Sequence, residues 1–219
     1  LGIRHRDDQT RDKALNKILT AAQRAEKVAN SVLGMARNRS EEFAPTDLKT
    51  LVEESLVLLE REMHKYRIAV QLELAATPPV RAIGNQIQQV LLNLMTNARQ
   101  AMPAGGTLTI KIAAESDDSM VDLVIRDTGQ GIPREQLPRI FDRYFTTKSG
   151  PDATGKGGAG VGLAACRDII QAHQGRIRVE STVGRGTSFT VRLPVFEETK
   201  QGPPAPVQAL GAPTADARQ

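Results

Sequence analysis

The sequence predicts a two-layer α/β sandwich of the α+β class, with helices on one face of a mixed, mostly antiparallel sheet. Two observations support this fold. Segments with helical spacing of apolar residues alternate along the chain with segments in which every second residue is apolar. These elements follow the order helix, strand, helix, strand pair, loop, helix, strand pair, and a long bundle-type helix precedes them.

The long first helix is expected over residues 10–39. Apolar or small residues recur there at alternating intervals of three and four, the spacing of a coiled coil or helix bundle. These residues are Leu15, Ile18, Ala22, Ala25, Ala29, Val32 and Ala36. A single apolar stripe must be covered, either by a partner helix or by the chain's own domain.

Two helices with a strand between them are expected next. Thr46 is the expected N-cap of a helix that runs to about Lys65. The segment RIAVQLEL then alternates, which predicts a half-buried strand over 68–74, and TPPV breaks that strand. A further helix is expected from Asn85, as its N-cap, to about Met102, because MPAGG ends the helical pattern.

The second half of the chain predicts an antiparallel hairpin, a glycine-rich loop, a helix and a final strand pair. The expected strands cover 107–113, 120–127, 176–181 and 187–193, and the expected helix covers 161–174. After Pro194 the composition becomes rich in Pro, Ala, Gln and Gly, which predicts a tail or linker without a core. The expected division is a helical segment at 1–45, a sandwich domain at 46–196 and a tail at 197–219.

Composition excludes several classes of protein. The single cysteine, Cys166, rules out an internal disulfide and a cysteine zinc cluster, and it fits a reducing compartment such as the cytoplasm. The net charge is only +4, without a Lys/Arg block, and two Tyr, five Phe and no Trp offer few platforms for bases, so we expect no nucleic-acid partner. No apolar run is long enough to span a bilayer, so we expect no membrane contact from this part of the protein.

The first candidate motif is NLMTNARQAM, in which Asn93 and Asn97 lie four residues apart on a helix. This spacing places both amides on one face, about one turn apart. A pair of neutral oxygen donors suits Mg²⁺, which prefers hard oxygen ligands and keeps waters and phosphate oxygens. Two solvated asparagines would produce the same pattern.

The second motif, DTGQGI, directly follows a strand. Asp127 could accept a hydrogen bond from a ligand amine there, while Gly129 and Gly131 would let a ring approach. A plain turn has the same composition.

The third motif is FDRYFTTK, with Phe141 and Phe145 four residues apart. The two aromatic rings are expected to anchor a loop to the body of the domain. Lys148 could then place a point charge on a phosphate, although a solvated lysine at a surface helix end fits equally well.

The fourth motif is GKGGAGVGLAACRDII, at 155–170, in which glycine is dense and a helix follows. Backbone N–H groups at a helix N-terminus bind anions, and glycine removes the Cβ that would obstruct a phosphate. The motif lacks the Gly-Lys-Ser/Thr of a Walker loop and does not follow a strand as a dinucleotide fingerprint does. A flexible linker remains the alternative.

Taken in this order and spacing, the four motifs resemble the N, G1, F and G2 boxes of the ATP-binding domain of sensor histidine kinases. That domain has a Bergerat-type fold, which gyrase, Hsp90 and MutL-type ATPases share. RGTSFTVRLP, at 185–194, is similar to the final glycine motif and strand of the same domain. The resemblance covers about 46–195, and YFTTK and GRIRVES are most similar to the histidine kinases.

The resemblance implies a histidine protein kinase that uses ATP and Mg²⁺ and relays the phosphoryl group to the receiver domain of a response regulator. Asn93 and Asn97 would hold the Mg²⁺, Asp127 would bond the adenine amino group, and 144–158 would form a lid over the ATP. The catalytic residues implied are Asn93, Asn97 and Lys148. The nucleotide contacts implied are Asn97, Asp127, Gly129, Gly131, Ile132, Tyr144, Phe145, Thr146, Thr147, Lys148, Gly158, Gly160, Val161, Gly162, Leu163 and Thr187. Gly155 to Gly158 would be the lid hinge, and Gly160 and Gly162 would approach phosphate.

Position 93 distinguishes a kinase from an ATPase within this superfamily. In the ATPase branches a Glu that activates water stands there, and Asn93 cannot serve as a general base. Phosphoryl transfer by positioning and charge stabilisation is therefore favoured over hydrolysis. The alternatives are an ATPase of this fold, a silent nucleotide-binding regulatory module, and an anti-sigma-type serine kinase, which the long first helix suits poorly.

The phospho-accepting histidine of the family does not match any segment of this chain. In the family it lies on the first of two dimerisation helices, in a segment such as His-Glu-x-x-Asn-Pro, and residues 10–39 resemble the second helix. His5 is expected in a solvated loop, and His64 and His173 are expected near helix C-termini, in capping or cationic roles. We therefore expect the acceptor upstream of Leu1 and a homodimer of the intact protein through its helical segment.

Overall fold

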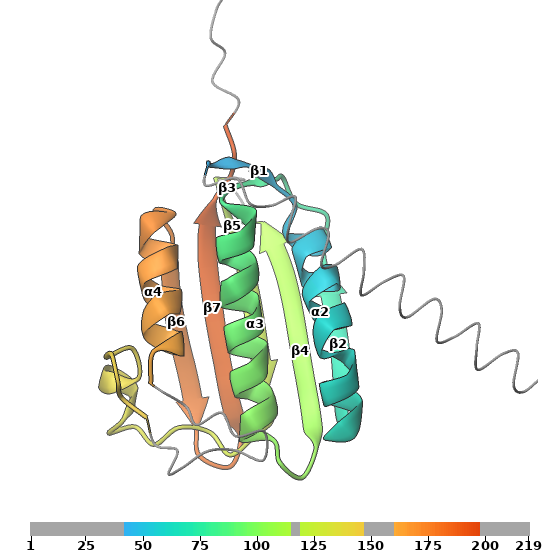
Figure 1. The fold of residues 1–219 in the computed structure, drawn as a ribbon, viewed down its shortest axis with the longest axis vertical. Coiled ribbons are helices and arrows are strands. Elements are labelled where there is room, and N and C mark those ends of the chain that lie inside the picture. Colours follow the sequence, from blue (N-terminus) through green and yellow to red (C-terminus); the bar gives the residue numbers. More distant parts are fainter. Residues whose placement is uncertain (1–41, 115–118, 147–159, 198–219) are drawn as a thin grey trace, which may run out of the picture.

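The computed structural model describes residues 42–114, 119–146 and 160–197. The expected helix at 10–39 and the tail after 197 lie outside these ranges. The described residues form the two-layer sandwich that the sequence predicts, with a layer of helices packed on one face of a sheet (Figure 1).

The main sheet has five strands in the spatial order β2-β4-β5-β7-β6. Their bounds are β2 Ile68–Leu74, β4 Gly106–Ala114, β5 Met120–Asp127, β6 Arg176–Thr182 and β7 Gly186–Pro194. The β2–β4 pair is parallel and the other three pairs are antiparallel. This confirms the expected mixed, mostly antiparallel sheet, and the hairpin of β4 and β5.

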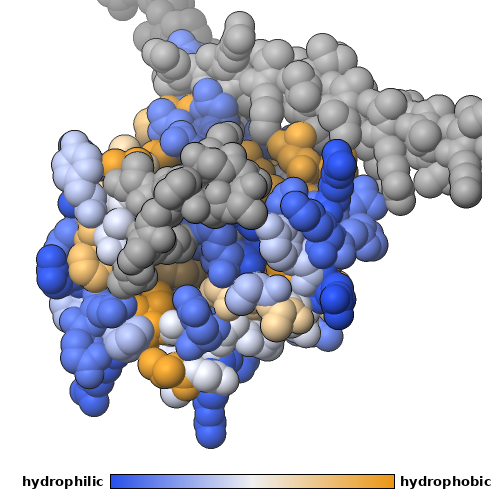
Figure 2. Space-filling view, turned by 60° about the horizontal axis from the view of Figure 1, so that its bottom comes forward, coloured by the Kyte–Doolittle hydropathy of each residue, from blue (hydrophilic) through white to orange (hydrophobic). Residues whose placement is uncertain are grey.

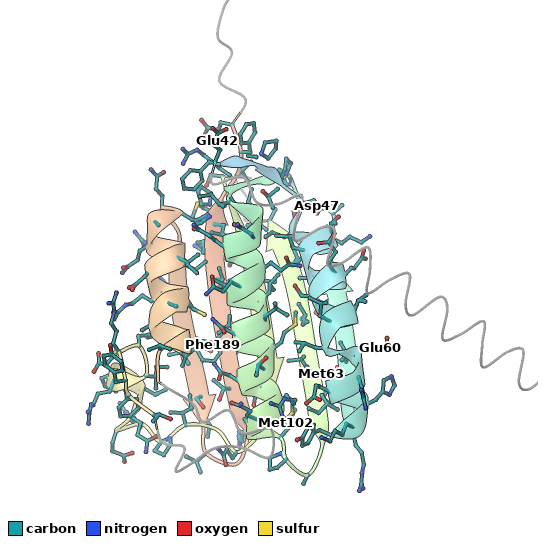
Figure 3. All side chains as sticks on the ribbon, in the orientation of Figure 1. Glu42, Asp47, Glu60, Met63, Met102 and Phe189 are labelled. Carbon is teal, nitrogen blue, oxygen red and sulfur yellow. The ribbon has the colours of Figure 1, made fainter. Side chains whose placement is uncertain are left out.

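Three helices cover one face of the sheet: α2 Leu48–Lys65, α3 Gly84–Ala101 and α4 Gly162–Ala172. The core lies between these helices and the sheet, where large apolar side chains are fully buried. They include Ile87, Leu91, Leu94, Met95, Leu108, Ile110, Leu123, Ile125 and Ile170. Met102 and Phe189, labelled in Figure 3, belong to this buried core, whereas Glu60 on α2 is exposed. No described helix is both long and apolar enough to span a membrane.

A second, two-stranded sheet was not predicted. Strands β1 Ala44–Thr46 and β3 Val80–Ala82 pair antiparallel at the end of the domain where α3 begins. Each strand has only three residues, and β1 contains Pro45 while β3 directly follows Pro79, so neither shows an alternating pattern. The TPPV segment that was expected only to break β2 therefore leads directly into β3.

Both expected N-caps are wrong. Helix α2 is capped by Asp47, whose Oδ1 accepts the Lys49 N–H at 2.9 Å, while Thr46 belongs to β1 and its hydroxyl donates to Ala82 O. The cap position of helix α3 lies two residues earlier than expected, at Ile83, which provides no side-chain cap. Asn85 consequently lies inside the first turn, and its buried Oδ1 has no hydrogen-bond partner among the described residues.

Candidate functional site

The predicted motifs meet at one end of the sandwich. The loop after β5, the β6–β7 turn and the start of α4 lie together at the lower end of the molecule in Figure 1. Figure 2 looks toward this end, where exposed hydrophobic side chains lie among mostly hydrophilic ones.

Asp127, the last residue of β5, is a buried acceptor at this end, with only 4% of its surface exposed. Its Oδ1 accepts hydrogen bonds from the Gly129 N–H at 2.8 Å and the Thr187 N–H at 3.2 Å. Burial raises the pKa of the carboxyl, and the two backbone hydrogen bonds oppose that rise. Both of these bonds are made by Oδ1. Oδ2 can therefore accept a hydrogen bond from the amino group of a ligand.

Gly129 and Gly131 are required by the packing of backbone against backbone. A Cβ on Gly129 would lie 2.5 Å from Ala101 O, at the end of α3. Gly131 has φ +72°, and a Cβ on it would overlap the carbonyl oxygen of Thr182. These glycines were expected to make room for a ligand ring, but the close approach at both is to protein backbone.

Ser181 on β6 also belongs to this site and was not predicted from the sequence. Its Oγ accepts the Ile132 N–H at 2.8 Å and lies 3.0 Å from Thr187 Oγ1. Thr187 is 5% exposed, and its backbone also bonds Asp127. No local pattern distinguishes Ser181 from its strand neighbours, because its partners come from two other segments of the chain.

Asn93 and Asn97 lie one turn apart on α3, as their spacing predicts, and Asn93 faces the start of α4. Asn93 Nδ2 donates to Gly162 O at 3.5 Å, and the side chain also bonds the Cys166 thiol. Burial raises the pKa of Cys166 to about 11, an effect that the bond to Asn93 reduces. A Cβ on Gly162 would lie 3.8 Å from Asn93 Cγ, so the Asn93 amide flanks the first turn of α4.

The two phenylalanines of FDRYFTTK anchor their loop as expected. The Phe141 ring lies edge-on to Phe189 at 6.5 Å between centroids, and the Arg139 guanidinium lies 4.7 Å from the Phe145 centroid. Both rings pack partly buried against the core. Tyr144 between them is 78% exposed.

The start of α4 is partly open to a ligand. Val161 occupies the cap position without a side-chain cap, so the first-turn N–H groups after it, from Gly162 and Leu163, can meet an anion. Gly160, with φ +67°, has a different role from the one expected. A Cβ there would lie 2.5 Å from the carbonyl carbon of Tyr144, so Gly160 approaches backbone rather than phosphate.

Several predicted lid residues cannot be placed in this site. Thr146 is exposed at the end of a described range. Thr147, Lys148, Gly158 and the expected hinge glycines lie outside the described residues.

The expected capping role of His173 is confirmed, because His173 is the C-cap residue of α4, but the expected cationic role is wrong. His173 is fully buried; its Nε2 accepts the Ile83 N–H at 2.9 Å, and its Nδ1 donates to Ile169 O at 2.8 Å. Burial lowers its pKa, the hydrogen bond to Ile169 O opposes part of this shift, and the nearby charge of Arg81 lowers the pKa further. The ring is thus a neutral internal bridge. His64 is exposed in the last turn of α2, as expected, where it lies 3.9 Å from Glu60.

The donors and acceptors at this end fit a purine nucleotide with a hard divalent cation. Asp127 suits an amino group, the first turn of α4 suits a phosphate, and the amide oxygens of Asn93 and Asn97 suit Mg²⁺. Among the described residues no group of three or more His, Cys, Asp or Glu could hold a metal ion.

Residues 82–197 match the family described as histidine kinase-, DNA gyrase B-, and HSP90-like ATPase. The chain is 35% identical over 195 residues to the signal transduction histidine-protein kinase AtoS of Escherichia coli K12, covering 89% of this chain and 31% of AtoS. It is 34% identical over 175 residues to the sensor histidine kinase ZraS of the same strain, covering 80% of this chain and 36% of ZraS. The chain thus spans about a third of the length of these relatives.

Two solved structures extend the similarity to the fold. The catalytic domain of histidine kinase ThkA superposes with a TM-score of 0.61 at 32% identity, covering 70% of this chain and 97% of that domain. A structure of ThkA in complex with the response regulator protein TrrA superposes with a TM-score of 0.58 at 28% identity, covering 89% of this chain and 53% of that one.

Proposed function

The chain belongs to the histidine kinase-, DNA gyrase B- and HSP90-like ATPase family, and on that premise we propose that it is the catalytic portion of a sensor histidine kinase. It binds ATP and transfers the γ-phosphoryl group to a histidine of a dimerisation domain. The receiver domain of a response regulator then takes the phosphoryl group. The similarity to a kinase solved with its response regulator supports this last step.

The observation that carries the proposal is the juxtaposition of Asn93 with the first turn of α4. Asn93 bonds Gly162 O, so an amide stands beside the N–H groups that suit the phosphates. An amide cannot take a proton from water, whereas it can position and polarise a phosphate chain. This arrangement favours transfer to a protein nucleophile over hydrolysis.

The proposed nucleotide site has three parts. Asp127 accepts from the adenine amino group, with the loop from Gly129 to Ile132 and Thr187 beside it. The α4 start at Val161–Leu163 meets the phosphates, together with Lys148 and the lid from Tyr144 onward. Asn97 and Asn93 hold Mg²⁺, which when bound neutralises phosphate charge.

We also propose the domain division and setting. Residues 46–196 form the catalytic domain, 1–45 belong to a dimerisation segment through which the intact protein forms a homodimer, and 197–219 form a tail or linker. Because the phosphoryl donor is ATP, the domain works in the cytoplasm.

The test is a phosphotransfer assay with γ-labelled ATP. The chain is incubated with and without a full-length dimerisation domain that carries its histidine. We expect label on the added histidine only, and none when Asp127→Asn replaces the wild-type chain. Label on a histidine of this chain itself would contradict the proposed acceptor. Steady-state hydrolysis that Asn93→Ala abolishes, without any transfer, would overturn the kinase proposal in favour of an ATPase.

A further inference from the structure

Ser181, Thr187 and Asp127 form one row across three neighbouring strands. Ser181 on β6 pairs directly with Thr187 on β7, and Thr187 N–H bonds Asp127 at the end of β5. All three lie at the candidate base-recognition end of the sheet. The row therefore links the edge strand β6 to the carboxylate that accepts the adenine amine.

The hydrogen bonds of Ser181 use all the bonding capacity of its hydroxyl. A serine hydroxyl has one proton and two lone pairs. The Ile132 N–H can only donate to it, at 2.8 Å, and Gly186 O can only accept from it, at 3.0 Å. The third contact, at 3.0 Å to Thr187 Oγ1, must then be donated by the threonine.

This assignment fixes the direction in which the Thr187 hydroxyl donates its hydrogen bond. Its single hydroxyl proton is directed at Ser181, so any further group that meets Thr187 Oγ1 finds an acceptor. Asp127 beside it is also an acceptor. A 6-aminopurine offers a donor to this wall, whereas a 6-oxopurine offers a carbonyl oxygen that finds no proton there.

We propose that Ser181 is a positioning residue that makes the site select 6-aminopurine over 6-oxopurine nucleotides by orienting the Thr187 hydroxyl. The proposal rests on the proposed binding of ATP at Asp127. Without the serine hydroxyl, the Thr187 hydroxyl is free to rotate and to donate to a ligand carbonyl.

Loss of the Ser181 hydroxyl leaves the local backbone supported. Gly184 N–H donates to Gln130 O at 2.8 Å, and Gln130 N–H donates to Ala101 O at 3.0 Å. These bonds hold the loop after β5 to the β6–β7 turn and to α3 independently of Ser181. The Ser181→Ala chain is therefore expected to fold.

The experiment compares ATP with inosine triphosphate, which carries a carbonyl in place of the 6-amino group. Dissociation constants are measured by calorimetry with Mg²⁺ on the whole chain. We expect Ser181→Ala to lower the preference for ATP about tenfold, the upper range of one net hydrogen bond. Ser181→Thr, which keeps the hydroxyl, should retain the wild-type preference. The matched control is Ser188→Ala, on the opposite face of β7.

Three outcomes would overturn the inference. The first is an equal loss of affinity for both nucleotides, which is the result of a merely structural role. The second is an unchanged preference in a chain whose melting curve shows it folded. The third is that Ser181→Ala lowers the preference for ATP just as much in a Thr187→Val chain, which has no Thr187 hydroxyl for Ser181 to orient. Failure of the wild-type chain to bind ATP would instead refute the proposed function.

Discussion

The two ends of the sandwich are built in opposite ways. At the end that carries β1 and β3, His173 bonds Ile83 on one side and Ile169 on the other, and its ring packs edge-on to Phe43 at 5.0 Å. The Arg81 guanidinium in turn covers the Phe43 ring at 4.2 Å. Both ring nitrogens of His173 are thus hydrogen-bonded to protein backbone, and its ring and the Phe43 ring are covered by protein side chains.

At the opposite end, backbone packs against backbone and the polar side chains are directed into the site. Gly129, Gly131 and Gly160 allow this packing, while Asp127 and Thr187 keep acceptor capacity. The difference shows that one end is closed for stability and the other is organised for a ligand. Substitutions at the two ends should therefore separate stability from nucleotide affinity.

The largest expected effect is on affinity, from Asp127→Asn. Asparagine can still accept the Gly129 and Thr187 N–H groups, but its amide nitrogen then faces the adenine amine, donor against donor. We expect ATP affinity to fall about 100-fold, from the loss of a charge-assisted bond, with little change in melting temperature. The control is Asp122→Asn, whose carboxylate lies on the same strand and binds Arg192. Unchanged affinity in Asp127→Asn would refute the base-recognition assignment.

Gly131→Ala should cause the largest loss of stability at the ligand end. The alanine must keep a left-handed backbone conformation, and its Cβ overlaps Thr182 O. We therefore expect a loss of about 3 kcal/mol in the free energy of unfolding. Gly184→Ala is the matched control, because it has φ +76° but no atom within 4 Å of the Cβ position. Urea denaturation of both variants separates the overlap from the backbone strain. Equal losses in the two would contradict the packing argument.

His173→Gln should destabilise the closed end without affecting the ligand end. The Ile83 N–H and the Ile169 carbonyl lose well-placed partners, and we expect a loss of about 2 kcal/mol in the free energy of unfolding. The ATP affinity measured by calorimetry, corrected for the fraction of folded protein, should stay at the wild-type value. His64→Gln, at an exposed site, should change neither quantity. A large change in affinity would show that the two ends are coupled.

Stability at the closed end should also depend on pH. The folded-state pKa of His173 is below the ordinary value of 6.5, so the unfolded chain takes up the proton first as pH falls. The free energy of unfolding should therefore decrease as pH falls through 6.5, until the pH lies below the folded-state pKa. Denaturation series from pH 8 to 5 should show this decrease in the wild type and a smaller one in His173→Gln. Identical slopes would contradict a buried, neutral His173.

The smallest effect is expected from Arg143→Ala. Arg143 bonds Asp168 at 2.9 Å, but the two side chains are 70% and 42% exposed, so solvent screens the pair. We expect a loss of at most about 0.5 kcal/mol. A loss several times larger by thermal denaturation would show that this pair, and not the aromatic rings, holds the loop to α4.

Patterns with local causes were predictable, and those that depend on distant partners were not. The five long strands and three helices follow from periodicity within each segment. The β1–β3 pair could not be predicted in this way, because each strand has only three residues, with Pro45 inside β1 and Pro79 before β3, too few to show an alternating pattern. The motif residues Asp127 and Asn93 were selected because their motifs resemble boxes that follow a fixed order in the family. Ser181 and the bridging role of His173 were missed because each has one partner far along the chain, Ile132 for Ser181 and Ile83 for His173.

The closed end also contains both ends of the described chain. Glu42 lies there in Figure 3, Val195 bridges to Val80, and Phe196 N–H donates to Pro79 O. Chain segments connected before Glu42 or after Phe196 therefore both join the domain at this same end. Helix α3, with 18 residues, extends about 27 Å from this end toward the other end of the domain. A rotation of the domain about its two flanks would therefore move the candidate nucleotide site, at the far end of α3, farther than the end that carries the flanks.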